Sequence, residues 1–217
     1  MDPKKIFDAV VNGDVQETQA GVNEALAANV PAEQILNEAL IPAMTEVGCL
    51  FEAQEFYVPE MLVSAKAMQS GLKMLKPLLA SQADPSSKKT NPKAVLGTVK
   101  GDLHDIGKDL VVMMLEGAGF QVTDLGVDVP PEKFIEAVND GAQMIGMSAM
   151  LTTTMLNMKV TIEALKDAGV RDKVKVIVGG APLTQSFADS IGADGFAKDA
   201  SSAVRKAKEL ITTQETT

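Results

Sequence analysis

The sequence predicts an α + α/β protein, in which a helical bundle precedes a domain built on a five-stranded parallel sheet with helices on both faces. Residues 4–80 carry apolar side chains at helical spacing and show no strand signal. Residues 81–92 are polar, with two prolines and three serines. From residue 93 onward, five short apolar runs alternate with helical patterns, which is typical of a parallel sheet with right-handed crossovers. This repeat matches the flavodoxin-like (Rossmann-like) doubly wound order.

Five short helices are expected in residues 4–80, and their brief connections predict a small antiparallel bundle. Asp14 is placed to cap the second helix, and Pro31 fits the first turn of the third. Pro42 opens or kinks the fourth helix, and Pro59 starts the fifth. The apolar residues expected on the helical faces are Ile6, Val10, Val11, Val15, Val22, Leu26, Val30, Ile35, Leu36, Ala39, Leu40, Met44, Val47, Leu50, Met61, Leu62, Ala65, Met68, Leu72 and Leu75.

The junction between the fourth and fifth helices, residues 51–59, holds three of the chain's eight aromatic residues, at Phe51, Phe56 and Tyr57. Two interpretations of it stay open. The segment is either a hydrophobic staple that fixes the angle between two helices, or an apolar lid over a ligand held by the second domain. Cys49, which lies just before it, is expected to be a small buried hydrophobic residue.

The polar stretch 81–92 predicts a linker between a bundle domain at 1–80 and an α/β domain at 93–217. A linker of about twelve residues would let the bundle pivot without detaching. The strands expected in the second domain are Ala94–Val99, Gln121–Asp124, Met144–Ser148, Lys175–Val178 and Gly195–Phe196. The helices expected there are Ile106–Gly117, Pro131–Asp140, Thr153–Ala168, Pro182–Ile191 and Ala200–Ile211.

The loop after the first expected strand contains His104, which is the chain's only histidine, and Asp102 two residues before it. In open α/β sheets, ligands bind at the carboxyl ends of the strands. A histidine at such an end, with a carboxylate beside it, suits a metal ligand whose other ring nitrogen is held by the acid. The alternative is a loop histidine that caps the following helix.

Two further loops are expected at the same edge of the sheet. Gly179 and Gly180 follow the fourth strand, and paired glycines let backbone approach a large flat or bulky ligand without interference from Cβ atoms. The loop after the third strand carries four hydroxyl side chains, which either hydrogen-bond a buried head group or cap the next helix: Ser148, Thr152, Thr153 and Thr154. The first loop lacks the G-x-G-x-x-G pattern, so no dinucleotide site is expected.

The composition argues against several classes of function. A net charge of -9 disfavours a nucleic-acid partner, which needs a basic face. The single cysteine, Cys49, excludes an internal disulfide and a cysteine-cluster metal site. Residues 1–5 are not followed by the apolar run of a signal peptide, and no 18-residue apolar run predicts a membrane span. The expected location is therefore the cytoplasm, with no membrane partner.

Together, these residues resemble the cobalamin-binding module, whose signature is D-x-H-x-x-G, then S-x-L, then G-G. The chain has Asp102–Gly107, Ser148–Met150 and Gly179–Gly180 at the three places. Met150 replaces the usual leucine, which is a volume-conserving apolar change. The preceding bundle, through residues 58–65, is similar to the one that caps methylcobalamin in methionine synthase. The resemblance covers nearly the whole chain.

The resemblance implies the chemistry of the first loop. His104 would take the lower axial position of the cobalt, so that cobalamin binds base-off and His-on. Asp102 would hydrogen-bond the other imidazole nitrogen. Thr154 falls where the family has a hydroxyl beside the Asp–His pair, so that these three residues would carry ligation and any proton transfer.

The resemblance also implies how the rest of the cofactor is held. Ser148 would contact the buried dimethylbenzimidazole. Phe51 and Val58 fall where the cap places apolar residues over the methyl face of the corrin. The remaining cofactor contacts that it implies are Gly101, Leu103, Asp105, Ile106, Gly107, Met150, Thr152, Gly179 and Gly180.

The activity that the resemblance implies is that of a corrinoid methyl carrier, as in methylamine, methanol or betaine demethylation. Cob(I)alamin would accept a methyl group from a substrate-specific methyltransferase, and methylcob(III)alamin would donate it to a second methyltransferase that serves a carrier such as tetrahydrofolate or a thiol. A reductive activator would recover cob(II)alamin, and the chain alone would not be catalytic. The alternatives are the cobalamin-binding subunit of an adenosylcobalamin mutase and a cobalamin-sensing regulator.

Overall fold

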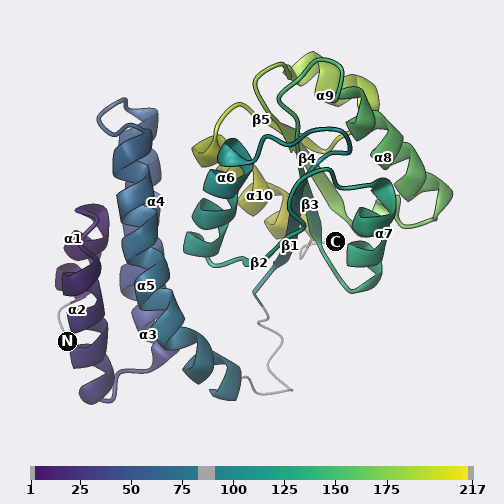
Figure 1. The fold of residues 1–217 in the computed structure, drawn as a ribbon. Helices are drawn as coiled ribbons and strands as arrows, with labels where there is room; N and C mark the ends of the chain where they lie inside the picture. Colours follow the sequence, from purple (N-terminus) through teal and green to yellow (C-terminus); the bar gives the residue numbers. More distant parts are fainter. Residues whose placement is uncertain (1–2, 83–90, 215–217) are drawn as a thin grey trace. The chain divides into compact units, whose positions relative to one another are not determined.

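The chain forms two compact units in a computed structural model that describes residues 3–82 and 91–214 (Figure 1). The first unit comprises Met1–Thr90 with Glu116–Gly119, and the second comprises Asn91–Leu115 with Phe120–Thr217.

The predicted linker, residues 81–92, overlaps the end of the last helix of the first unit, which extends to Gln82. Its residues 83–90 lie outside the described part of the chain. The domain limits 1–80 and 93–217 therefore stay a prediction.

The first unit is helical, as predicted from its apolar spacing. Asp14 caps the second helix, because its side chain accepts a hydrogen bond of 2.9 Å from the backbone N–H of Glu17. The helices are α1 (Pro3–Val11), α2 (Val15–Ala27), α3 (Ala32–Ile35), α4 (Ile41–Glu52) and α5 (Val58–Gln82).

The third and fourth expected helices are joined without a break. A π-helical segment, Leu36–Leu40, connects α3 directly to α4. Pro42 has no N–H to donate to the carbonyl of Glu38, as a regular α-helix would require. The wider turn of the π-helix accommodates this missing bond, so Pro42 modifies the helix instead of opening a separate one.

Two burial predictions for the bundle are wrong. Leu62 was expected on the buried side of α5 but is 40% exposed, whereas Met61 beside it is fully buried. Adjacent residues of a helix point about 100° apart, so these two cannot both face the same core. Cys49 is exposed for the same reason, since the buried stripe of α4 runs through Ala43, Met44 and Val47.

The second unit contains a five-stranded parallel sheet in the order β2-β1-β3-β4-β5, which confirms the predicted doubly wound topology. Each strand lies within two residues of its predicted limits. The strands are β1 (Lys93–Thr98), β2 (Gln121–Asp124), β3 (Met144–Ser148), β4 (Lys175–Gly179) and β5 (Gly195–Ala197).

Helices cover both faces of this sheet, with α7, α8 and α9 on one face and α6 and α10 on the other (Figure 1). The face under α7 and α8 holds a core that includes Phe134, Ile145 and Ile162, all fully buried. The helices are α6 (Ile106–Gly117), α7 (Pro131–Asn139), α8 (Leu156–Asp167), α9 (Gln185–Ile191) and α10 (Ala200–Gln214).

Two helices start three residues later than predicted. α8 begins at Leu156 rather than Thr153, and α9 begins at Gln185 rather than Pro182. Thr184 supplies the cap of α9, because its hydroxyl accepts a hydrogen bond from the N–H of Phe187. The residues before α8 belong instead to the site described below.

The register of the sheet brings the three predicted loops together. Thr98 of β1 is paired with Ser148 of β3, and Ser148 is paired with Gly179 of β4. Neighbouring strands lie about 5 Å apart. The loops after β1, β3 and β4 therefore leave the sheet side by side at its carboxyl edge.

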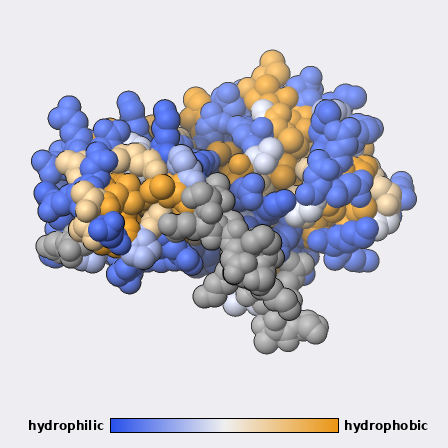
Figure 2. Space-filling view, turned by 90° about the horizontal axis from the view of Figure 1, so that it is seen from below, coloured by the Kyte–Doolittle hydropathy of each residue, from blue (hydrophilic) through white to orange (hydrophobic). Residues whose placement is uncertain are grey.

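The visible surface of both units in Figure 2 is mostly hydrophilic, with apolar areas between the charged ones. Within residues 3–82 and 91–214, no helix is both long enough and apolar enough to span a bilayer.

Candidate functional site

The carboxylate of Asp102 is the buried centre of the site, with none of the residue exposed to solvent. Its Oδ1 accepts hydrogen bonds from the backbone N–H and from Nδ1 of His104, at 3.1 and 2.8 Å. Its Oδ2 accepts from the backbone N–H of Met150 at 2.8 Å and from the hydroxyl of Thr154 at 2.5 Å. Two loops that are about 50 positions apart in the sequence thus meet on one side chain.

The pKa of Asp102 follows from this environment. Burial raises the pKa, because it penalises the charged form. The hydrogen bonds from Thr154, Met150 and His104 outweigh burial and hold the pKa well below its ordinary value. Asp102 is therefore a carboxylate at neutral pH, and it can only accept hydrogen bonds.

His104 presents one ring nitrogen to solvent. Because Nδ1 lies against Asp102, the nitrogen that points away from the carboxylate is Nε2, and the side chain is 56% exposed. Among the described residues, Nε2 has no hydrogen-bond partner. The hydroxyl of Thr98 fixes the backbone by donating to the carbonyl of His104 at 3.0 Å. The ring thus binds Asp102 and does not cap α6.

The late start of α8 has a functional consequence. Thr154 lies in the turn before Leu156, and its hydroxyl reaches Asp102 instead of capping the helix. Of the four predicted hydroxyls, only this one contacts the Asp–His pair among the contacts of the described residues. Ser148 lies half-buried at the end of β3, while Thr152 and Thr153 are exposed beyond it.

The glycine pair after β4 lets two loops approach closely. A Cβ atom on Gly180 would lie 1.9 Å from the carbonyl oxygen of Ala149, and Gly180 has a φ of +135°. A Cβ atom on Gly179 would lie 2.9 Å from the carbonyl oxygen of Ala197. Both positions therefore need glycine for the backbone itself. Gly107 differs, because a Cβ there would meet nothing within 4 Å.

Exposed apolar side chains lie in the same two loops as Asp102, His104 and Thr154. Leu103 and Ile106 flank His104 in the sequence and are 70% and 82% exposed, and Met150 and Leu151 after β3 are also exposed. Exposed apolar residues gathered around a polar group are typical of a ligand surface. Asp105 is exposed in the same loop.

The two predicted cap residues belong to the first unit. Phe51 is half-buried near the end of α4, and Val58 is exposed at the first position of α5. Between them, Tyr57 is exposed, and its N–H donates to the carboxylate of Glu60 at 3.0 Å.

Two residues at the site were not predicted. Asp128, between β2 and α7, accepts a hydrogen bond of 2.6 Å from the N–H of Gly101, and Asn157 of α8 donates to the carbonyl of Lys100 at 2.7 Å. Both contacts depend on how segments that follow separate strands meet, and a single Asp in a loop or a single Asn at the start of a helix gives no signal of that kind.

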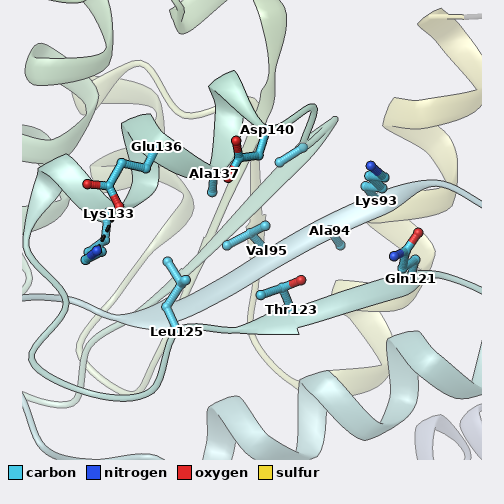
Figure 3. A pocket seen from close by; sticks show the side chains of 11 residues that line it. Lys93, Ala94, Val95, Gln121, Thr123, Leu125, Lys133, Glu136, Ala137 and Asp140 are labelled. Carbon is cyan, nitrogen blue, oxygen red and sulfur yellow. Dashed lines mark hydrogen bonds and ion pairs between the residues drawn. The ribbon is translucent and has the colours of Figure 1, made fainter.

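A cavity elsewhere in the second unit has a volume of about 360 Å³ (Figure 3). It begins at the amino ends of β1 and β2, and Lys133 and Glu136 form an ion pair of 2.7 Å at its wall. None of the predicted site residues lines it. Its lining is Lys93, Ala94, Val95, Gln121, Thr123, Leu125, Lys133, Glu136, Ala137, Asp140 and Ala142.

The carboxyl edge of the sheet has the chemistry of a metal-ligand site. A neutral imidazole ligates through one nitrogen while a carboxylate holds the other N–H, which fixes the tautomer and strengthens the donor. A site with one imidazole suits a metal that receives its other ligands from a macrocycle. The apolar surface formed by Leu103, Ile106 and Met150 suits the hydrocarbon parts of such a ring.

The contribution of the Asp102 carboxylate to stability can be tested by lowering the pH of the cofactor-free protein. A lowered folded-state pKa adds stability above the unfolded value of about 3.9, and this stability is lost as pH falls through the folded value. We expect Asp102→Asn to lower the free energy of unfolding at pH 7 and to flatten its decline between about pH 5 and 2. Urea denaturation along a pH series measures both.

Thr154→Ala is the matched variant for this test, because it keeps the carboxylate and removes one donor. It should weaken the pH dependence less than Asp102→Asn does. Parallel pH profiles for wild type and Asp102→Asn would contradict the lowered pKa.

Comparisons with known proteins agree with this geometry. A family model described as a B12 binding domain matches residues 92–206, and a second with the same description matches residues 4–76. The chain is 45% identical over 208 residues to dimethylamine corrinoid protein 3 of Methanosarcina acetivorans, with 95% of each chain covered. It is 42% identical over 208 residues to the trimethylamine corrinoid protein of Methanosarcina barkeri, again with 95% of each covered.

A solved structure extends the similarity to the fold of the whole chain. One chain of a methanol:cobalamin methyltransferase complex from Methanosarcina barkeri matches with a TM-score of 0.84 and 30% sequence identity. The match covers 97% of the present chain and 79% of that chain.

Proposed function

The chain belongs to the cobalamin-binding corrinoid proteins of methyltransferase systems, and we propose that it carries a methyl group on His-ligated cobalamin between two methyltransferases. The single observation that carries this proposal is the pair formed by His104 and Asp102. One imidazole nitrogen is held by a buried carboxylate, and the ring is 56% exposed in a loop that also carries exposed apolar residues.

The residues present fit the cofactor. When bound, cobalamin supplies a cobalt centre that accepts a methyl group and gives it up again. His104 would ligate the cobalt through Nε2, and Asp102 would orient the ring and keep the proton on Nδ1. Ser148, at the end of β3 beside Gly179 of β4, would contact the nucleotide tail.

The residues around His104 also supply a place for a proton. Nε2 of His104 would be the atom that holds this proton whenever it does not serve as a ligand, while the carboxylate of Asp102, 2.8 Å from Nδ1, would keep the ring in place. Thr154 donates its own hydroxyl proton to Asp102 and would keep that carboxylate in position. The backbone N–H of Met150 also donates to Asp102, and this hydrogen bond holds the loop after β3 against the loop after β1.

The proposed partners follow from the relatives. Similarity to dimethylamine and trimethylamine corrinoid proteins favours a methylamine as the methyl source, presented by a substrate-specific methyltransferase. A second methyltransferase would transfer the methyl group to an acceptor such as a thiol or tetrahydrofolate, and a reductive activator would rescue oxidised cofactor. The cytoplasm remains the proposed location.

The experiment that tests the function combines reconstitution with transfer. The purified chain is loaded with hydroxocobalamin, reduced, and mixed with a dimethylamine- or trimethylamine-specific methyltransferase and labelled amine. We expect one label per cobalamin in the presence of the methyltransferase and none in its absence. Turnover by the isolated chain would contradict a carrier, and failure to bind cobalamin would reject the proposal altogether.

The junction between α4 and α5 is proposed to cover the methyl face of the bound cofactor. Tyr57 and Val58 are exposed at this junction, which leaves apolar surface available for a ligand. Phe51→Ala should therefore accelerate photolysis of bound methylcobalamin, because a looser cage lets the radical pair separate before it recombines. Light-dependent absorbance changes measure the rate.

Phe7→Ala on α1 is the matched control, since it removes the same side chain from the same unit away from the junction. Photolysis at the wild-type rate in Phe51→Ala would favour the alternative, in which the junction only fixes the angle between the helices.

A further inference from the structure

Asp128 connects the loop that carries His104 to a different part of the sheet. Its Oδ1 accepts the N–H of Gly101 at 2.6 Å, and its own N–H donates to the carbonyl of Asp102 at 3.0 Å. Asp128 has a φ of +53°, and Gly101 has a φ of +82°. Asp128 is thus hydrogen-bonded to two consecutive residues of the loop, once through its charged side chain to Gly101 and once through its backbone to Asp102.

The segment that presents Asp128 is itself fixed to the end of β1. The N–H of Thr98 donates to the carbonyl of Gly126 at 3.0 Å, and the N–H of Val129 donates to the carbonyl of Thr98 at 2.9 Å. At the end of β2, Asp124 accepts the N–H of Gly126 at 2.8 Å and the ammonium of the buried Lys108 at 2.6 Å. These hydrogen bonds fix the backbone on both sides of Asp128 relative to β1 and β2.

The loop after β1, which Asp128 contacts at Gly101, carries His104 three residues further along the chain. Asp102 receives the contact of Asp128 on its backbone and the two contacts of His104 on its side chain. A shift of the backbone at residues 101 and 102 would therefore move the carboxylate that orients the imidazole. Small displacements of such a supporting group weaken ligation because the donor atom leaves its bonding direction.

We propose that Asp128 is a positioning residue for the axial ligand, because it holds the backbone of Gly101 and Asp102 where His104 can ligate a cofactor metal. The inference rests on the proposed function for the identity of the metal centre. It adds a residue outside the D-x-H-x-x-G signature, and it assigns to the β2–α7 loop the task of keeping the ligand loop in one conformation.

A pair of substitutions separates the hydrogen bond from the backbone conformation. Asp128→Asn keeps a side-chain oxygen that can accept the N–H of Gly101, and asparagine tolerates a positive φ. Asp128→Gly also tolerates that φ but removes the acceptor. Asn29→Gly, at a φ of +59° in the first unit, controls for the added flexibility of a glycine.

The first measurement uses the protein without cofactor. Amide hydrogen exchange of Gly101 by NMR should be about tenfold faster in Asp128→Gly than in wild type, the ratio that corresponds to a hydrogen bond of about 1.4 kcal/mol. Asp128→Asn should stay near wild type, and Asn29→Gly should leave Gly101 unchanged. Equal exchange of Gly101 in Asp128→Gly and wild type would overturn the proposal.

The second measurement loads each protein, prepared with 15N-labelled histidine, with cob(II)alamin and uses electron paramagnetic resonance, in which 15N splitting reports the axial imidazole and not the benzimidazole of the cofactor. The ratio of His-on to His-off cofactor should fall about tenfold in Asp128→Gly and little in Asp128→Asn. An unchanged ratio in Asp128→Gly would refute the proposal. If wild type itself showed no 15N splitting, the proposed function would be wrong. Amide hydrogen exchange of Gly101 would still test the hydrogen bond to Asp128.

Discussion

His104→Ala is expected to abolish the His-on state of the bound cofactor. The chain has no other histidine. Hydrogen bonds to Asp102 and from Thr98 fix the backbone N–H and the backbone carbonyl of His104. Loss of a group that only orients a ligand costs about 10- to 100-fold in metal affinity. Loss of the ligand itself should therefore lower the affinity for cobalamin on the order of 100-fold or more, as measured by titration followed in the absorption spectrum.

Two controls make this result specific. The free energy of unfolding of the cofactor-free variant should change little, because the ring of His104 is more than half exposed. Added 15N-labelled imidazole should produce 15N splitting in the electron paramagnetic resonance spectrum of bound cob(II)alamin. A His-on absorption spectrum in His104→Ala without added imidazole would reject the assignment of the ligand.

Gly180→Ala should produce the largest loss of stability among the substitutions discussed. The new Cβ would lie 1.9 Å from the carbonyl oxygen of Ala149, so the loops after β3 and β4 would have to separate. This separation would break the hydrogen bond of 3.2 Å from the N–H of Ala149 to the carbonyl of Gly179. We expect a loss on the order of 3 kcal/mol in the free energy of unfolding, from overlap and backbone strain together.

Gly169→Ala supplies the matched comparison. Gly169 has a φ of +67°, and a Cβ there would meet nothing within 4 Å. Only the left-handed conformation is penalised at that position, at a cost of about 1 kcal/mol. Urea denaturation of both variants measures the difference. If Gly180→Ala were no less stable than Gly169→Ala, the close approach of the two loops would be wrong.

The sequence by itself determined the two kinds of unit and the topology of the sheet. Short apolar runs that alternate with helical patterns leave few arrangements other than a parallel sheet with crossovers. Strand limits were predicted within two residues because a buried run, such as Ala94–Val99, ends where polar residues such as Lys100 begin. The same limits predicted that Asp102, Ser148 and Gly179 would gather at one edge.

The sequence also identified the central pair of the site, since His104 is unique in the chain and Asp102 lies only two residues away. Contacts over such short separations depend mainly on local backbone geometry. The helical spacing was less informative for individual residues in the bundle. Leu62 and Cys49 are apolar or nearly so, yet they are exposed, because the buried stripe of a helix is fixed by what packs against it.

Only the tertiary structure decided which partners complete the site. The resemblance had placed Thr154 beside the Asp–His pair, but the contacts of Met150 with Asp102 and of Asp128 with Gly101 were not predicted. All three contacts join loops that follow different strands. Their formation depends on strand register and on a few backbone dihedral angles, and a shift of one residue would replace each donor by a neighbour. Hydrogen bonds have short range and strict direction. Amino-acid type therefore indicated which residues could form such bonds, while the folded backbone selected the ones that do.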